Sequence, residues 1–209
     1  NQILVHAVIQ PVPISLSLLL GDILHNLRGT LDHLAYSLAQ VHSGILLNED
    51  IAKDSEFPLF SVANEVLFAR KTRGMSPQAQ AAIERLQPYN RPDPTKDILW
   101  VLNRLSNIDK HRLLLTSALA NMSGIPRGDG SFAVESIELE SHFLEGDAKI
   151  ATLTVRPTGS SKKVNVQYMP IIEVVFKCGC LVDSNSVEQV LIAIIRRISS
   201  VTAELDQFL

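Results

Sequence analysis

The sequence predicts an α+β fold, with a core dominated by helices and an antiparallel sheet of about four strands. Apolar residues recur at spacings of three and four over residues 14–42 and 186–208, which is the period of a helix with one buried face. Between residues 132 and 178 the period changes to two, which is typical of strands. A length of 209 residues with 46% hydrophobic residues predicts a single domain over residues 1–209.

The first expected elements are a strand and a long helix. Residues 3–9 are rich in β-prone side chains and end at Pro11 and Pro13, so we expect a strand that can join the sheet. The helix over residues 14–42 ends at Ser43-Gly44. Its apolar stripe, which we expect to be buried, consists of Leu24, Leu27, Leu31, Leu34, Leu38 and Val41.

The middle of the chain predicts a loop and three further helices. Residues 44–60 are expected to form the loop, in which Phe57-Pro58-Leu59-Phe60 anchors onto the core. The helices are expected over residues 61–73, 77–87 and 96–121. Ser76 precedes Pro77 as an N-cap precedes the first helical residue, and Thr95 is the expected cap of the third helix. The run Leu113–Ala120 is apolar nearly all round, which predicts a central, buried helix half.

The expected sheet follows, and a final helix closes the chain. The strands are predicted at residues 132–143, 149–156, 164–168 and 171–177. Their short links favour an antiparallel meander. Pro170 cannot donate a ladder hydrogen bond, so it is expected at an edge or a bulge. The last helix, over residues 186–208, presents one apolar face to the core.

Charge and composition exclude several classes of protein. A formal net charge of -3 without a basic tail disfavours nucleic acid and anionic membranes as partners. The apolar run Ile14–Leu24 is short and interrupted by polar residues, so we expect no membrane span. Cys178 and Cys180 are expected to be two ordinary thiols in a reducing cytoplasm. Asn1 in place of methionine is compatible with removal of an N-terminal segment.

Polar residues interrupt the first helix beside its leucine stripe. His25, Arg28 and Asp32 fall on one side, and Arg28 and Asp32 have the i,i+4 spacing of an ion pair. A further stripe consists of Asn26, Thr30, His33 and Ser37. A buried helix must satisfy such groups by hydrogen bonds, so we expect a polar partner segment elsewhere in the chain.

The expected partner is the segment Asn103–Arg112, where Asn103, Asn107 and His111 recur every four residues. We therefore expect Arg28 and Asp32 to lie within reach of Asn107 or His111. The cluster is either an internal polar network that sets helix register or a ligand site. The candidate ligand-binding residues are His25, Asn26, Arg28, Asp32, Asn107, Asp109, Lys110 and His111.

No metal ion or cofactor is expected. His25 and Asp32 are about 10.5 Å apart along one helix, too far to hold one ion together. A set that combines His25, Asp32 and His111 from two helices is the remaining metal alternative. The sequence contains neither a phosphate-binding glycine loop, nor a Gly-x-Ser-x-Gly elbow, nor a His-Glu-x-x-His motif.

Scattered segments resemble an uncharacterised family of bacterial proteins of about this size. The segments are Leu20-Gly21-Asp22-x-Leu24-His25-Asn26-Leu27-Arg28-x-x-Leu31-Asp32-His33-Leu34, Asn107-x-Asp109-Lys110-His111-Arg112, Phe57-Pro58 and Gln87-Pro88-Tyr89. This resemblance implies a bacterial origin and a shared site, without a known activity.

A more distant likeness is to HEPN domains, helical proteins that include metal-independent ribonucleases. Their motif is an arginine, four to six residues, and then a histidine. Arg28 with His33, and Arg104 with His111, match that spacing, although a third of this chain is expected to be sheet. The likeness implies that Arg28 stabilises the phosphate and His33 acts as acid or base, at the interface of a dimer.

The sequence thus favours a non-catalytic binding or scaffold protein that forms a homodimer through apolar helix faces. The alternatives are the HEPN-like ribonuclease with Arg28 and His33 as catalytic residues, and a protein that binds a small molecule or a metal.

Overall fold

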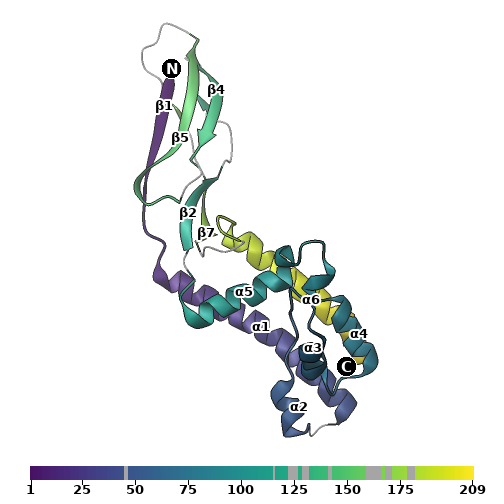
Figure 1. Ribbon diagram of the computed structural model, residues 1–209. Helices are drawn as coiled ribbons and strands as arrows, with labels where there is room; N and C mark the ends of the chain where they lie inside the picture. Colours follow the sequence, from purple (N-terminus) through teal and green to yellow (C-terminus); the bar gives the residue numbers. More distant parts are fainter. Residues whose placement is uncertain are drawn as a thin grey trace. The chain divides into compact units, whose positions relative to one another are not determined.

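The α+β prediction is confirmed in the computed structural model, which combines helices with antiparallel sheets (Figure 1). The structure describes residues 1–44, 47–114, 116–121, 127–128, 132–140, 143–158, 166–167, 171–177 and 182–209. The chain divides into two compact units. The sheet unit comprises residues 1–14, 115–178 and 183–187, and the helical unit comprises residues 15–114, 179–182 and 188–209. The single domain over residues 1–209 stays a prediction.

The sheet unit is built on three antiparallel strands in the order β1-β5-β4. These are β1 (Gln2–Ile9), β4 (Phe132–Leu139) and β5 (Gly146–Pro157). Leu153 of the central strand pairs with Ile3 on one side and with Ile137 on the other. The expected joining of the first strand to the sheet is therefore confirmed.

Two apolar clusters of buried residues hold the sheet unit together. One contains Phe132, Leu153 and Val155. The other brings Ile9 together with Ala118, Leu144, Ala148 and Ile150. Both clusters use alternate residues of β5, because successive side chains of a strand point to opposite faces.

Two short ladders replace the rest of the expected meander. β2 (Thr116–Asn121) pairs with β7 (Ile171–Phe176), and β3 (Arg127–Gly128) pairs with β6 (Val166–Gln167), all antiparallel. Among the strands that the structure describes, only the β4–β5 pair joins strands that are neighbours in the chain. Pro170, Cys178 and Cys180, on which expectations were placed, lie outside the described residues.

The expected helix over residues 96–121 is wrong in its second half. The helix, α5 (Ile98–His111), ends where Arg112 adopts an extended conformation, and the chain then forms β2. A continuous apolar run fits a buried strand as well as a buried helix, so its pattern does not distinguish the two. Pairing with β7, whose residues lie about 50 to 60 positions later in the chain, decides for the strand.

The helical unit carries the long helix α1 (Ile14–Ser43) and the C-terminal helix α6 (Val187–Leu205), followed by a 3-10 turn at Asp206–Phe208. The short elements between them are α2 (Glu49–Asp54), α3 (Glu65–Thr72), α4 (Pro77–Arg85), η1 (Pro88–Asn90) and η2 (Pro94–Lys96). The leucine stripe of α1 is buried as expected at Leu24, Leu31, Leu34 and Leu38, whereas Leu27 is half-buried and Val41 is exposed.

Side-chain caps set several helix starts in this unit. Ser76 accepts a hydrogen bond from the Ala79 backbone N–H and Pro77 opens α4, as expected. The cap of α5 is Asp97 and not Thr95, which belongs to η2. Asn64 caps α3, so this helix begins four residues later than the expected start. α2 forms inside the expected loop with Asn48 as its cap.

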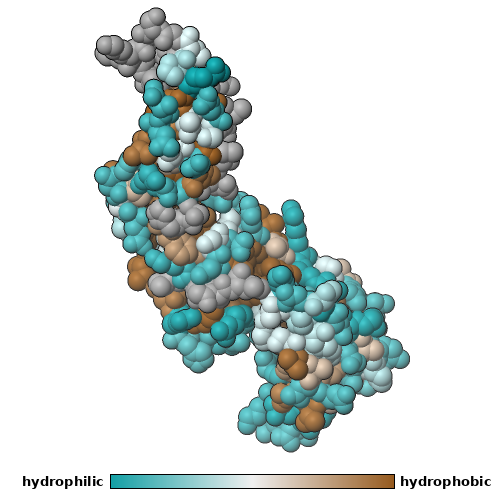
Figure 2. Space-filling view, turned by 45° about the horizontal axis from the view of Figure 1, so that its top comes forward, coloured by the Kyte–Doolittle hydropathy of each residue, from teal (hydrophilic) through white to brown (hydrophobic). Residues whose placement is uncertain are grey.

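The visible face of the helical unit is mostly hydrophilic, and apolar residues gather on it in small patches (Figure 2). Among the described residues, no helix is both long and apolar enough to cross a membrane.

Candidate functional site

Arg28 and Asp32 of α1 bind the backbone of one residue, Phe57, in the loop that follows α2. The Arg28 guanidinium donates through Nη2 to the Phe57 carbonyl oxygen at 2.8 Å and to Glu56 Oε1 at 3.0 Å. Through Nη1 it donates to Asp32 Oδ1. The same Asp32 oxygen accepts a hydrogen bond from the Phe57 backbone N–H at 3.0 Å. The i,i+4 pair thus binds both polar groups of Phe57.

Gln87 holds the same loop from the other side. Its side chain is completely buried. Nε2 donates to the Pro58 carbonyl oxygen at 2.8 Å, and Oε1 accepts from the Phe60 backbone N–H at 3.2 Å. The Tyr89 backbone N–H then donates to the Phe60 carbonyl oxygen at 3.2 Å. We call residues 56–60 the anchor segment, because α1 and residues 87–89 bind it at both ends.

The anchor segment buries its apolar side chains as the sequence predicts. Phe57, Pro58 and Leu59 are buried, and Phe57 is fully so. An extended buried segment must satisfy its backbone N–H and C=O groups without a sheet, and side chains of Arg28, Asp32 and Gln87 do this here. Three sequence segments, those that contain Arg28, Phe57 and Gln87, therefore meet at one structural feature.

The charges around Glu56 are compensated. Partial burial raises the pKa of this carboxyl, but the hydrogen bond and charge of Lys71 outweigh it, together with the charges of Arg28 and Lys110. The pKa of Glu56 is therefore lowered from its ordinary value. The positive charge of Lys110 is therefore the contribution of the 107–112 segment of α5 to the lowered pKa of Glu56.

The polar segments of α1 and α5 approach each other at Gly21 and Asp109. A Cβ atom on Gly21 would overlap the Asp109 carboxylate, so α1 and α5 come close at this glycine. The hydrogen bonds that the structure describes for Arg28 and Asp32 go to each other and to the anchor segment, and none involves Asn107 or His111.

The remaining candidate residues lie mostly in solvent. His25, Asn26 and His33 of α1 are exposed, as are Asn107, Lys110 and His111 of α5, while Asp32 and Asp109 are half-buried. Thr30 donates to the carbonyl oxygen of Asn26 in its own helix. Arg28 alone among them is buried, at 6% exposure.

This geometry bears on the ribonuclease hypothesis. Both terminal nitrogens of Arg28 are already engaged with carboxylates and a carbonyl, whereas His33 is exposed. A phosphate would have to displace two carboxylates to reach this guanidinium. The hypothesis stays a prediction, and the contacts of Arg28 support the alternative of an internal polar network.

Metal ligation draws no support from the parts of the chain that the structure describes. No three His, Cys, Asp or Glu side chains are grouped there in a way that could hold an ion.

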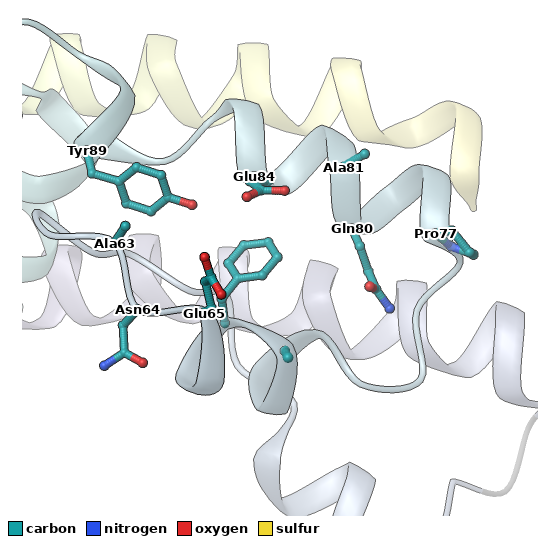
Figure 3. Close-up of a pocket in the computed structure, with 10 residues that line it drawn as sticks. Ala63, Asn64, Glu65, Pro77, Gln80, Ala81, Glu84 and Tyr89 are labelled. Atoms are coloured by element: carbon teal, nitrogen blue, oxygen red, sulfur yellow. The ribbon is translucent and has the colours of Figure 1, made fainter.

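A pocket of about 380 Å³ lies between α3, α4 and the turn η1 (Figure 3). Its lining residues are Ala63, Asn64, Glu65, Phe68, Ala69, Pro77, Gln80, Ala81, Glu84 and Tyr89. In Figure 3, Glu65 projects from α3 and Glu84 from α4 toward the space between the two helices, and the Tyr89 ring lies at one end of it. This volume falls within the range of small-molecule sites.

The pocket is acidic. Two of its ten lining residues are carboxylates, Glu65 and Glu84, and none is basic. Burial raises the pKa of Tyr89 above its ordinary value, and the charges of Glu84 and Glu65 raise it further. The negative potential of both carboxylates therefore reaches the phenol at the end of the pocket.

The anchor segment positions two walls of this pocket. Its C-terminal residue Phe60 receives the hydrogen bond of the Tyr89 backbone, which places η1. The chain then continues through Ala63 to Asn64, the cap of α3. On the opposite wall, Gln80 donates to the carbonyl oxygens of Thr72 and Met75, which ties α4 to the end of α3.

Sequence reasoning missed the pocket. Its carboxylates and its tyrosine stand at positions 65, 84 and 89 on three different elements, and no spacing rule relates them. The only sequence feature that bears on the pocket is indirect: the segments 57–60 and 87–89, which position its walls.

Comparison of the chain with models of protein families, with curated proteins and with solved structures finds no match in any of the three.

Proposed function

We propose that this protein is a non-catalytic binding protein and that the pocket between α3 and α4 is its ligand site. The observation that carries the proposal is the pocket itself, a space of about 380 Å³ with convergent polar groups and an aromatic wall. Arg28 and Asp32 of α1 affect the pocket indirectly. They bind the anchor segment, and the anchor segment in turn binds the backbone of Tyr89.

The engagement of Arg28 favours binding over catalysis. An arginine that stabilises a developing anion must present free donors to the reacting group. Here the guanidinium is committed to Asp32, Glu56 and the Phe57 carbonyl. Self-association as a dimer remains part of the proposal, with exposed apolar residues of α6, Ile192 and Ile195, as the candidate contact.

The test is a fragment screen followed by NMR on the isotopically labelled full chain. We expect a subset of small fragments to shift the backbone signals of Asn64, Glu65 and Tyr89 in a saturable way. The variant Ala81→Trp, which fills the pocket from α4, should abolish these shifts. Ala193→Trp, at an exposed position of α6 outside the pocket, is the matched control and should leave them unchanged. Shifts that survive Ala81→Trp would contradict the proposal.

The catalytic alternative is tested beside it with labelled RNA in EDTA. We expect no cleavage by the wild type. Cleavage that disappears in His33→Ala would replace the binding proposal with the ribonuclease.

A further inference from the structure

The pocket carries two carboxylates, Glu65 and Glu84, and both side chains are exposed. Among the described residues, neither Glu65 nor Glu84 has a basic partner within ion-pair distance, and no lining residue is basic. The basic residues next to the lining residues in sequence pair with carboxylates outside the pocket. Arg70, next to Ala69, pairs with Asp54, and Arg85, next to Glu84, approaches Glu204 of α6 at 3.8 Å.

Other carboxylates that line a pocket or adjoin buried backbone have a basic partner. Glu56 pairs with Lys71 and Arg28, and Asp97 pairs with Arg91 at 3.4 Å. A second pocket, of about 280 Å³ in the sheet unit, contains one carboxylate, Glu145, and there Lys177 neutralises it at 2.8 Å.

The two pocket carboxylates also stand differently with respect to their helices. Glu65 occupies the first turn of α3, where the positive end of the helix dipole stabilises a negative charge. Glu84 lies in the last turn of α4, where the dipole opposes it. A cation in the pocket would therefore stabilise the negative charge of Glu84 in particular.

The rest of the lining suits an aliphatic cation. The rings of Phe68 and Tyr89 and the small side chains of Ala63, Ala69 and Ala81 provide apolar and aromatic surface beside the carboxylates. An ammonium group gains both from a carboxylate and from the face of an aromatic ring. Methylene groups can pack on the alanines.

We infer that the ligand of this pocket is a small aliphatic diamine, which places one ammonium group at each of Glu65 and Glu84 and its methylene chain against the aromatic and alanine wall. Two positive charges match the two unneutralised negative charges, and the small volume fits a short chain. This inference rests on the proposed function, because it names the class of ligand for the same pocket.

The experiment is an NMR titration of the full chain with 1,4-diaminobutane, and separately with 1,4-butanediol as the neutral compound of the same length. We expect the diamine to shift the signals of residues 63–69 and 80–89 saturably, and the diol to leave them unchanged. Raising the salt concentration should weaken diamine binding, as it does for partly exposed ion pairs.

Variants then locate the binding. Glu84→Gln and Glu65→Gln should each raise the dissociation constant of the diamine roughly 2- to 5-fold, the range for an exposed charge contact. Glu49→Gln is the matched control, because Glu49 is an exposed carboxylate in the first turn of α2, as Glu65 is in α3, and it lies outside the pocket. It should have no effect.

The outcomes separate the two claims. If the diol or other neutral fragments bind at the same residues as tightly as the diamine, the binding function stands and the cationic class is overturned. Equal loss in all three Gln variants would mean unspecific attraction and would also overturn it. N-acetyl-lysine methylamide carries one charge, and binding tighter than that of the diamine would overturn the two-charge assignment. If no compound shifts the pocket, the binding function falls as well.

Discussion

The helical unit holds its carboxylates in two contrasting ways. At the anchor segment, Asp32 and Glu56 face Arg28 and Lys71, and every charge has a partner. At the pocket, Glu65 of α3 and Glu84 of α4 project toward the space between their helices, and no basic side chain lines that space (Figure 3). The contrast teaches that carboxylates beside buried backbone are neutralised within the chain, whereas exposed carboxylates in a pocket wall can keep their charge without an ion pair.

The largest effect that this contrast predicts is the loss of Arg28. Arg28→Ala leaves Asp32, Glu56 and the Phe57 carbonyl without their shared donor, at a buried position. Both carboxylates keep some exposure to water, so the free energy of unfolding should fall by about 2–3 kcal/mol, less than for a fully buried pair. Arg28→Lys retains the charge without the fork and should lose roughly half as much.

Urea denaturation measures these changes. Arg85→Ala is the control, because its contact with Glu204 is long and exposed, and it should stay within about 0.5 kcal/mol of the wild type. An Arg28→Ala protein as stable as that control would show that the network does not support the fold.

The second effect concerns Gln87, which holds the anchor segment without charge. Gln87→Leu keeps a similar shape but leaves the Pro58 carbonyl and the Phe60 N–H unpaired. We expect a loss of about 1–3 kcal/mol in the free energy of unfolding, the cost of unsatisfied buried groups. Gln78→Leu, at an exposed position of α4, should change almost nothing in the same measurement.

A direct comparison of two carboxylates gives a smaller effect. Glu56→Gln removes the partner of Lys71 and should lower the free energy of unfolding by about 0.5–1 kcal/mol, since the pair is half exposed. Glu84→Gln removes a charge that the α4 dipole opposes and should keep stability within about 0.5 kcal/mol, on the stabilising side. The same sign of change in both variants would remove the distinction between the two groups of charges.

The smallest effect is the pH dependence of Glu56. Its pKa in the folded protein is lowered from the ordinary value of 4.5, so the unfolded state binds the proton more tightly. The stabilisation is therefore present above pH 4.5 and is lost as the pH falls through the lower folded-state pKa. Melting temperatures of the wild type and Glu56→Gln should differ at neutral pH and converge in acid. A constant difference down to the lowest pH would contradict the lowered pKa.

Local pattern was sufficient for much of the fold. The three-and-four spacing of α1 and α6, the Ser76-Pro77 start of α4 and the two-residue period of β4 and β5 all predict the observed elements. The anchor segment was also predicted, because an apolar run between polar loops must be buried somewhere. Each of these depends on residues that are close in sequence.

The candidate site was predicted only in part. The i,i+4 spacing of Arg28 and Asp32 indicates their ion pair, and this pair forms. Its further partners, Glu56 and the Phe57 backbone, belong to a segment more than 20 residues away. From α5, Asp109 lies against Gly21 of α1 and the charge of Lys110 acts on Glu56, whereas the proximity of Asn107 or His111 to Arg28 and Asp32 stays a prediction. Helical spacing shows on which face of its own helix a residue lies. It does not show which residue of another element will contact it.

By itself, the sequence determined which segments are amphipathic, where α4 begins and most of the buried face of α1, because these follow from local periodicity and from capping chemistry. Tertiary structure alone decided that residues 116–121 form a strand, because the partner strand supplies the hydrogen bonds that select it over a helix. It likewise decided that Glu65, Glu84 and Tyr89 share one pocket, because three separate elements must first pack before their charges can meet.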